Sequence, residues 1–206
     1  MIVRDVTTLC ADGRREPLGP DDLCALWLHR IGRQIGADAV DIASWFIRGD
    51  GARYTGGQMP YHYVVTQHGV QQALPLDERG AHARRWGNAH GIGIAVQGDF
   101  RSQEPSERQW DWAAELCADL LPALGPIPEP MLGHIPMHLL PGLPVYGHGE
   151  VPIAYGRDSE KHTPTGRYAC PGQYWAMDSF REAVRDELRR RSVGALMAGG
   201  HRLHST

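Results

Sequence analysis

The chain has 206 residues, of which 42% are hydrophobic and 22% are charged, as in an ordinary globular protein of one domain. Its 21 Lys and Arg residues and 24 Asp and Glu residues give a formal net charge of −3, so the concentrated positive charge typical of nucleic-acid-binding proteins is missing. No apolar run approaches the roughly 18 residues that a membrane-spanning helix needs, which excludes a membrane span.

The beginning of the chain predicts a buried strand followed by a helix. Residues 23–28 form a continuous apolar run that is short enough for a strand, with His29 at its end. Residues 38–47 carry apolar side chains at helical spacing, and Asp38 is placed to cap this helix. The stretch 48–57 is rich in Gly and Arg and predicts a loop.

The middle of the chain predicts further strands. Residues 61–66 and 70–74 flank a short turn in which Gly69 can adopt a positive backbone angle, so they predict a β-hairpin. A short apolar run predicts another strand at residues 92–96.

Two more helices are predicted in the second half. Apolar side chains line one face of residues 105–124, and Pro105 and Ser106 supply the start of this helix. Residues 122–144 are rich in Pro and Gly and predict irregular structure. A last helix is predicted at 178–191, where three consecutive Arg residues suit the negative end of the helix dipole. Strands and helices are intermixed around one core, which predicts a single α/β or α+β domain.

The ends of the chain are expected to contribute little to this domain. We expect the domain to span residues 1–192, with its core at about 23–192, and residues 193–206 to form a flexible tail. Residues 1–5 lack the charged-then-apolar pattern of a secretory signal, so we expect synthesis in a cytoplasm without a signal peptide.

The four cysteines are scattered and do not have the spacing of a disulfide scaffold. Cys24 lies in an apolar run and Cys117 on the apolar face of a predicted helix, so both are expected to be buried thiols. Cys170 lies instead in the turn-rich sequence Ala-Cys-Pro-Gly, where an inert core thiol is less expected.

Three residues are candidates for a catalytic metal site. His29 ends a buried strand, His148 lies in Gly-His-Gly-Glu, and Cys170 precedes Pro-Gly. Neutral imidazole and thiolate are natural zinc ligands, and three protein ligands with an open fourth position are typical of catalytic zinc. Their spacing matches no compact zinc finger. A cysteine hydrolase, with Cys170 as nucleophile and His148 as base, is therefore an alternative.

Several short motifs follow one another in a characteristic order. They are Pro60-Tyr61-His62-Tyr63-Val64-Val65, Ala81-His82-Ala83 with Asn88, Gly91-Ile92-Gly93-Ile94-Ala95-Val96-Gln97-Gly98, His148-Gly149-Glu150 and Cys170-Pro171-Gly172. Together they resemble the type-2 N-acetylmuramoyl-L-alanine amidases, a family that includes bacteriophage lysozyme-type amidases and peptidoglycan recognition proteins. The resemblance implies a central mixed β-sheet flanked by helices, with a zinc site at one end of the sheet.

The resemblance also implies roles for individual residues. His29, His148 and Cys170 match the ligands of one zinc per chain, and Tyr61 matches a tyrosine that lies beside the zinc. Zinc activates water near neutral pH. The implied reaction is therefore hydrolysis of the amide bond between N-acetylmuramic acid and L-alanine in peptidoglycan. The phenol of Tyr61 would position the water or stabilise the oxyanion, a contribution often worth a few kcal/mol.

The sequence departs from the family at two positions. Ala95 stands where some members carry a glutamate base, and Tyr168 stands where members place a Lys or Thr two residues before the third ligand. Tyr168 is therefore our second candidate catalytic residue, by position. The other candidates for this role are Lys161, His162, Thr165 and Arg167.

Roles are also predicted for further residues and for the protein as a whole. His82 is a candidate for the substrate groove or its polar rim, His62 for a core or supporting role, and Glu150 for supporting the metal site or pairing with a cation. Because no secretory signal is recognised, we expect a monomeric phage endolysin that acts on the bacterial cell wall after membrane disruption. A bacterial recycling enzyme and a domain of a larger lysin are alternatives. A peptidoglycan-binding module without activity is the other alternative, although members that only bind lack the cysteine ligand.

Overall fold

The computed structural model describes residues 1–11, 16–19, 22–32, 38–128, 135, 142–150 and 170–200. Within these ranges the strands form one six-stranded sheet in the order β1-β4-β3-β5-β2-β6. The strands are β1 (Val3–Asp5), β2 (Ala25–Ile31), β3 (Tyr63–Val65), β4 (Val70–Gln72), β5 (Gly91–Gln97) and β6 (Val145–Gly147).

The sheet is mixed, as predicted. β3 and β4 form the antiparallel hairpin, whereas every other neighbouring pair of strands is parallel. At the centre, β2 pairs with β5 along its whole length, and its other edge pairs with β6. Parallel strands are covered on both faces, which explains why residues 25–28 of β2 are all apolar.

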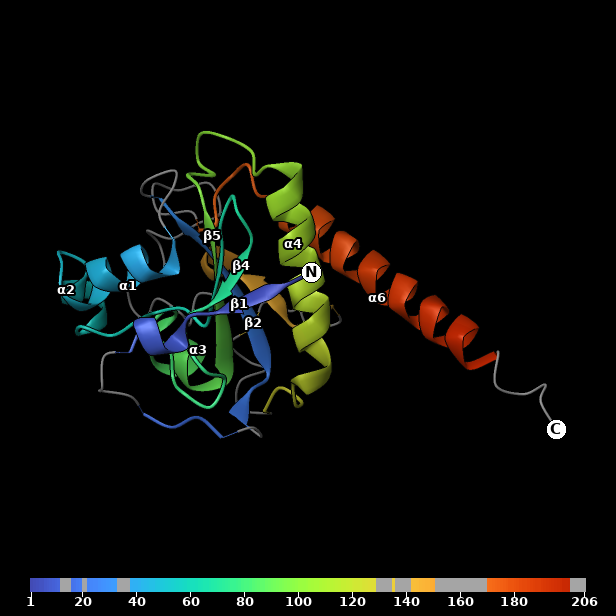
Figure 1. Cartoon of the computed structure of the whole chain (residues 1–206), viewed down its shortest axis with the longest axis horizontal. Helices are drawn as coiled ribbons and strands as arrows, with labels where there is room; N and C mark the ends of the chain where they lie inside the picture. Colours follow the sequence, from blue (N-terminus) through green and yellow to red (C-terminus); the bar gives the residue numbers. More distant parts are fainter. Residues whose placement is uncertain are drawn as a thin grey trace.

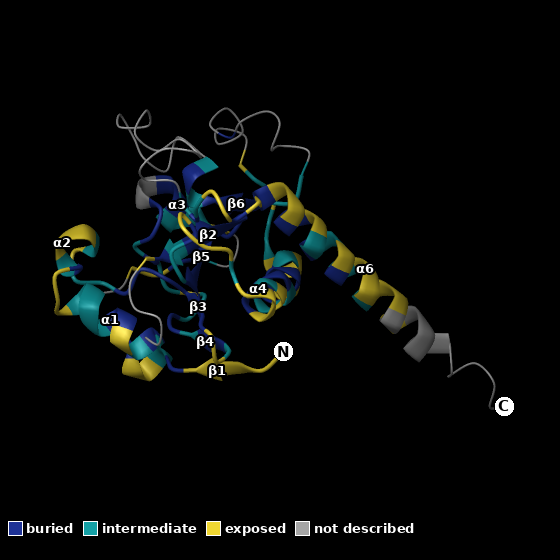
Figure 2. Cartoon of the chain, turned by 90° about the horizontal axis from the view of Figure 1, so that it is seen from above, coloured by how far each residue is buried: buried dark blue, intermediate teal, exposed yellow. Residues whose placement is uncertain are grey.

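Helices cover both faces of the sheet. Figures 1 and 2 show α1, α2 and α3 on one side of the strands and α4 and α6 on the other. The helices are α1 (Ala39–Ile47), α2 (Ala52–Thr55), α3 (Arg84–His90), α4 (Glu107–Leu120) and α6 (Met177–Gly200). Short 3-10 turns are η1 (Thr7–Leu9), η3 (Leu121–Ala123) and η4 (His148–Glu150).

The larger part of the core lies between the sheet and the pair α4 and α6. Leu26 and Leu28 of β2 point to this side and pack in one cluster with Cys117 of α4 and Phe180 of α6. The start of α4 is capped as its sequence predicts, because the Ser106 hydroxyl accepts a hydrogen bond from the N–H of Gln109 at 3.2 Å.

Two smaller clusters cover the opposite face. One joins Ile31 of β2 to Ile42 of α1, and the other joins Trp27 of β2 to Trp86 of α3. Because side chains alternate along a strand, His29 lies on this face between Trp27 and Ile31. It therefore points into the region where the two clusters meet.

Several element boundaries differ from the prediction. β2 continues two residues beyond His29, so this histidine lies within the strand. The expected loop at 48–57 contains the short helix α2, and the three-residue strands β1 and β6 were not predicted. α6 reaches Gly200, past the predicted end at 191 and into the segment expected to be a tail. Charge pairs at helical spacing, such as Arg189–Asp186, lie within the part of α6 that was predicted.

The predicted buried thiols are confirmed, since Cys24 and Cys117 are buried and unpaired with any other cysteine. Burial raises the pKa of Cys24 to about 11, so this thiol stays protonated near neutral pH. None of the helices in the described part of the chain combines the length and apolar character needed to cross a membrane.

Candidate metal centre

The structure brings the three predicted ligands together. One candidate ligand atom from each of His29, His148 and Cys170 lies within 4.8 Å of the others. Nδ1 of His29 is 3.9 Å from Sγ of Cys170, and the rings of His29 and His148 are 4.4 Å apart between centroids. Among the residues that the structure describes, no other group of three His, Cys, Asp or Glu side chains is close enough to hold a metal.

His29 lies on an inner strand of the sheet. β2 is paired on both edges, with His29 beside Ala95 of β5 and Leu28 beside Gly147 of β6. The imidazole is buried, and its pKa is well below the ordinary value because of burial and the nearby rings of His148 and His82. A neutral imidazole with a fixed position is suited to bind a cation.

His148 follows β6 directly and opens the turn η4. The carboxylate of Glu150 accepts a hydrogen bond from the N–H of Gly147 at 2.7 Å and pairs with the guanidinium of Arg181 on α6. Arg181 also donates from Nε to the carbonyl of Val145 at 2.9 Å. The prediction that Glu150 pairs with a cationic side chain is confirmed. This ion pair holds the turn that carries His148 against α6.

Cys170 reaches the site through a close approach of two backbone segments. The N–H of Gly149 donates to the carbonyl of Cys170 at 2.7 Å. A Cβ on Gly149 would lie 3.0 Å from that carbonyl oxygen, and a Cβ on Gly147 would lie 3.0 Å from Cδ of Pro171. The two glycines around His148 therefore let the third ligand come near the second.

The electrostatics of Cys170 disfavour a free nucleophile. Burial raises the pKa of its thiol to about 11, although the backbone N–H and the positive charge of Arg30 act in the opposite direction. A catalytic cysteine needs a lowered pKa, commonly from a protonated histidine beside it. Here the neighbouring His29 is held neutral by burial, so the arrangement suits metal ligation better than thiol catalysis.

Tyr61 lies beside the candidate ligands. Its ring is 5.2 Å from the ring of His29 and 5.8 Å from that of Phe46 on α1, measured between centroids. Tyr61 precedes β3, so it is not a residue of the strand itself. Burial raises the pKa of its phenol above the ordinary value. The hydroxyl therefore keeps its proton and can act as a hydrogen-bond donor.

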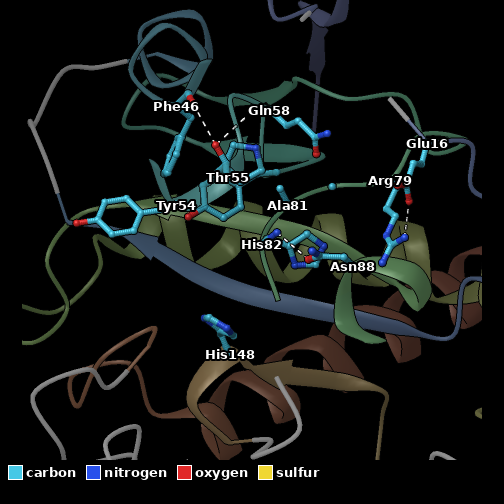
Figure 3. A pocket seen from close by; sticks show the side chains of 13 residues that line it. Glu16, Phe46, Tyr54, Thr55, Gln58, Arg79, Ala81, His82, Asn88 and His148 are labelled. Atoms are coloured by element: carbon cyan, nitrogen blue, oxygen red, sulfur yellow. Dashed lines mark hydrogen bonds and ion pairs between the residues drawn. The ribbon is translucent and has the colours of Figure 1, made fainter. Parts of the chain in front are cut away.

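A cavity of about 510 Å³ opens beside these residues. Figure 3 shows His148 facing it from one side and His82 with Asn88 from another. The ion pair between Arg79 and Glu16 lies at one end of the pocket. The remaining lining residues are Phe46, Tyr54, Thr55, Gln58, Pro60, Tyr61, Gly80 and Ala81. A volume of this size is typical of pockets for small organic ligands.

His82 has a contact that the sequence did not reveal. It lines the cavity, and its Nδ1 also lies 3.2 Å from Nε2 of His29. The only signal was its place in the Ala-His-Ala motif. His62 is fully buried, as expected, where its Nδ1 accepts from the N–H of Gly93 at 2.9 Å and its Nε2 lies 2.9 Å from the carbonyl oxygen of Glu78.

Of the two positions that depart from the family, the structure describes Ala95 but not Tyr168. Ala95 is buried in the apolar cluster with Ile31 and Tyr61, directly opposite His29 on the neighbouring strand. Tyr168 lies outside the described residues, as do the alternative candidates Lys161, His162, Thr165 and Arg167.

A known protein family matches this chain over most of its length. The sequence profile of a family described as N-acetylmuramoyl-L-alanine amidase matches residues 25–173, which include all three candidate ligands. No curated protein sequence matches the chain.

Several solved structures share the fold. The N-acetylmuramoyl-L-alanine amidase LysC from Clostridium intestinale is 14% identical, and the match covers 90% of this chain and 98% of that chain with a TM-score of 0.58. The Ph2119 endolysin from a Thermus scotoductus bacteriophage is 18% identical, with coverage of 89% and 99% and a TM-score of 0.59. The catalytic domain of XlyA is 19% identical, with coverage of 89% and 99% and a TM-score of 0.56. At these identities the likeness establishes the fold.

Proposed function

The chain belongs to the N-acetylmuramoyl-L-alanine amidase family, and from this we propose that it is a zinc-dependent hydrolase of peptidoglycan. The bond cleaved would be the amide between N-acetylmuramic acid and L-alanine. The observation that carries the proposal is the convergence of His29, His148 and Cys170 beside a pocket of about 510 Å³.

The donor set fits zinc. Two imidazoles and one thiol are the ligand types that zinc prefers, and three of them leave a position for a reactant. Ligand atoms around a tetrahedral zinc are about 3.3–3.6 Å apart, and the 3.9 Å between Nδ1 of His29 and Sγ of Cys170 is only slightly wider. When bound, zinc would supply a Lewis acid that activates water and polarises the amide carbonyl.

The side chains of this chain would bind and orient the reactants. The protonated phenol of Tyr61 can donate a hydrogen bond to the charge that develops on the amide oxygen, or to the attacking water. Ala95 cannot carry a proton, so we assign the catalytic roles to Tyr61 and, by its position before Cys170, to Tyr168. His82, Asn88 and His148 line the pocket in which the amide would lie.

Digestion of purified peptidoglycan tests the bond that is cleaved. Mass spectrometry should detect stem peptides with a free L-alanine amino terminus and intact glycan strands. New reducing sugar ends without new amino termini would mean a glycosidase, which needs a pair of flanking carboxylates. New amino termini at D-alanine or diaminopimelate would be compatible with the metal site. They would refute the proposed cleavage between N-acetylmuramic acid and L-alanine.

Metal analysis of the same protein tests the mechanism. We expect one zinc per chain, loss of activity on chelation and recovery on adding zinc. His148→Ala should lose zinc and activity, whereas His68→Ala, at an exposed turn position, should keep both. Activity that survives complete removal of zinc would favour Cys170 as a nucleophile, and binding of peptidoglycan without turnover would indicate a binding module.

We further propose that the protein acts as a monomeric endolysin. The Thermus phage protein of similar fold is an endolysin, and a soluble hydrolase of the cell wall suits release by membrane disruption. The protein should lower the turbidity of permeabilised bacteria but not of intact cells, and sedimentation should give the mass of one chain, 22.8 kDa.

A further inference from the structure

We propose that His82 is a positioning residue, which fixes the tautomer of His29 so that Nδ1 of His29 is the atom that binds the metal. The inference rests on the proposed zinc site, but it concerns a residue outside the three ligands. It follows from the direction of one hydrogen-bond chain, which runs from the carbonyl of Gly91 through His82 to His29.

The carbonyl oxygen sets the direction of this chain. Nε2 of His82 lies 3.2 Å from the carbonyl oxygen of Gly91. A carbonyl can only accept, so this nitrogen carries the proton. Both imidazole rings are buried, which favours their neutral forms, and Nδ1 of a neutral His82 is then an acceptor.

The proton position on His29 follows directly. Nδ1 of His82 is 3.2 Å from Nε2 of His29, so Nε2 of His29 must be the donor in this contact. The lone pair of His29 is therefore on Nδ1. That nitrogen faces Cys170, with 3.9 Å between Nδ1 and Sγ. The proton of His29 is therefore held on Nε2, on the side of His82, and not on the nitrogen that faces Cys170.

The surrounding backbone holds the His82 ring in place. A Cβ on Gly93 would lie 2.6 Å from Cδ2 of His82, and a Cβ on Gly80 would lie 2.7 Å from the same atom. Glycine at both positions therefore makes room for the ring. The Oδ1 of Asn88 accepts from the N–H of His82 at 2.8 Å (Figure 3). It also accepts from the N–H of Ala83 at 2.6 Å. These contacts fix the segment from which the ring projects.

His82 acts through His29 and is not itself a ligand in this arrangement. Its Nδ1 is already engaged with Nε2 of His29, and its Nε2 with Gly91. Partners of this kind fix the tautomer and orientation of a histidine ligand, and their loss typically lowers metal affinity by about 10- to 100-fold. A role for His82 only in lining the cavity would leave zinc affinity unchanged.

Two variants of the full chain separate these roles. His82→Leu keeps the bulk but removes the acceptor, whereas His82→Asn places an amide oxygen near the position of Nδ1. We expect His82→Leu to bind zinc about 10- to 100-fold more weakly in competition with a chromophoric chelator. His82→Asn should recover most of this loss, and His68→Leu, at an exposed turn position, should match the wild type. Equal zinc affinity of His82→Leu and wild type would overturn the inference.

The tautomers can also be measured without any variant or metal. In the zinc-free wild-type protein, long-range ¹H–¹⁵N NMR should show the proton on Nε2 of both His29 and His82. A proton on Nδ1 of His29 would overturn the inference even if His82→Leu failed to fold. A wild type that shows these tautomers but binds no zinc would refute the proposed zinc hydrolase while leaving the hydrogen-bond chain intact.

Discussion

Arg181 of α6 forms a largely buried ion pair with Glu150 of η4, which lies two residues after His148. The guanidinium also donates to the carbonyl of Val145, which belongs to β6. The last helix therefore holds the turn that carries a candidate metal ligand, although no residue of α6 is itself a candidate ligand. Stability of the helix and integrity of the metal site should be coupled through this pair.

Replacing Arg181 with methionine should test that coupling. Arg181→Met leaves Glu150 partly buried without its cation, so the free energy of unfolding should fall by about 3 kcal/mol. The zinc content of the purified protein should fall as well. Arg185→Met is the matched control, because Arg185 pairs with Glu182 at the surface of the same helix, and it should change stability by less than about 1 kcal/mol. Similar losses in both variants, measured by denaturant unfolding, would contradict the coupling.

Zinc affinity should rise with pH. Burial raises the pKa of the Cys170 thiol to about 11, so the zinc-free protein carries the proton, which zinc must displace. His29 is already neutral because its pKa is lowered. One displaced proton predicts about a tenfold gain in affinity per pH unit between about pH 7 and 9. Chelator competition across this range measures the slope, and Cys170→Ala should abolish it. A flat profile in the wild type would mean that Cys170 is not a ligand.

The zinc-free protein should lose stability in mild acid. Burial lowers the pKa of His29 and His82 well below the ordinary value of 6.5. The unfolded chain therefore binds these protons at higher pH than the folded chain. The contribution to stability is complete above about pH 6.5 and is lost as the pH falls from there towards the lowered values. Denaturant unfolding from pH 7.5 to 5 should show this loss, and it should be smaller in His82→Asn.

The hydroxyl of Tyr61 should matter for turnover and not for folding. Tyr61→Phe keeps the ring that packs against Phe46, so thermal unfolding and zinc content should change little. Loss of one donor to the reacting oxygen should lower kcat by about ten- to a thousandfold. Tyr54→Phe removes a hydroxyl from another residue that lines the same pocket, on an exposed ring, and should leave kcat unchanged. Equal rates for Tyr61→Phe and wild type would place Tyr61 among the packing residues and direct attention to Tyr168.

The main elements of the fold could be predicted because their sequences carry strong local signals. Most of β2 and β5 lies in apolar runs, at residues 23–28 and 92–96, as expected of parallel strands that are covered on both faces. The start of α4 is marked by Ser106 and Gln109, which form a capping box. β1 and β6 have only three residues each. Whether such short segments become strands depends on the neighbours with which they pair, which local sequence does not reveal.

The candidate site was predictable only in part for a similar reason. His29, His148 and Cys170 could be identified because each lies in a motif that resembles a family. The contact between His29 and His82 joins residues 53 positions apart. It depends on the space left by Gly80 and Gly93, so it is a property of the folded backbone that no local pattern predicts.

The ligands of the candidate centre also have a topological consequence. His29 and Cys170 are 141 positions apart, and the chain between them includes β3, β4, β5 and β6. A metal held by both residues would close a loop that contains most of the sheet. By analogy with a disulfide, a link across so long a loop can lower the entropy of the unfolded chain by an amount equivalent to about 5 kcal/mol. The metal would then act as a reversible cross-link, and an enzyme deprived of it would become easier to unfold and to digest at the same moment that it became inactive.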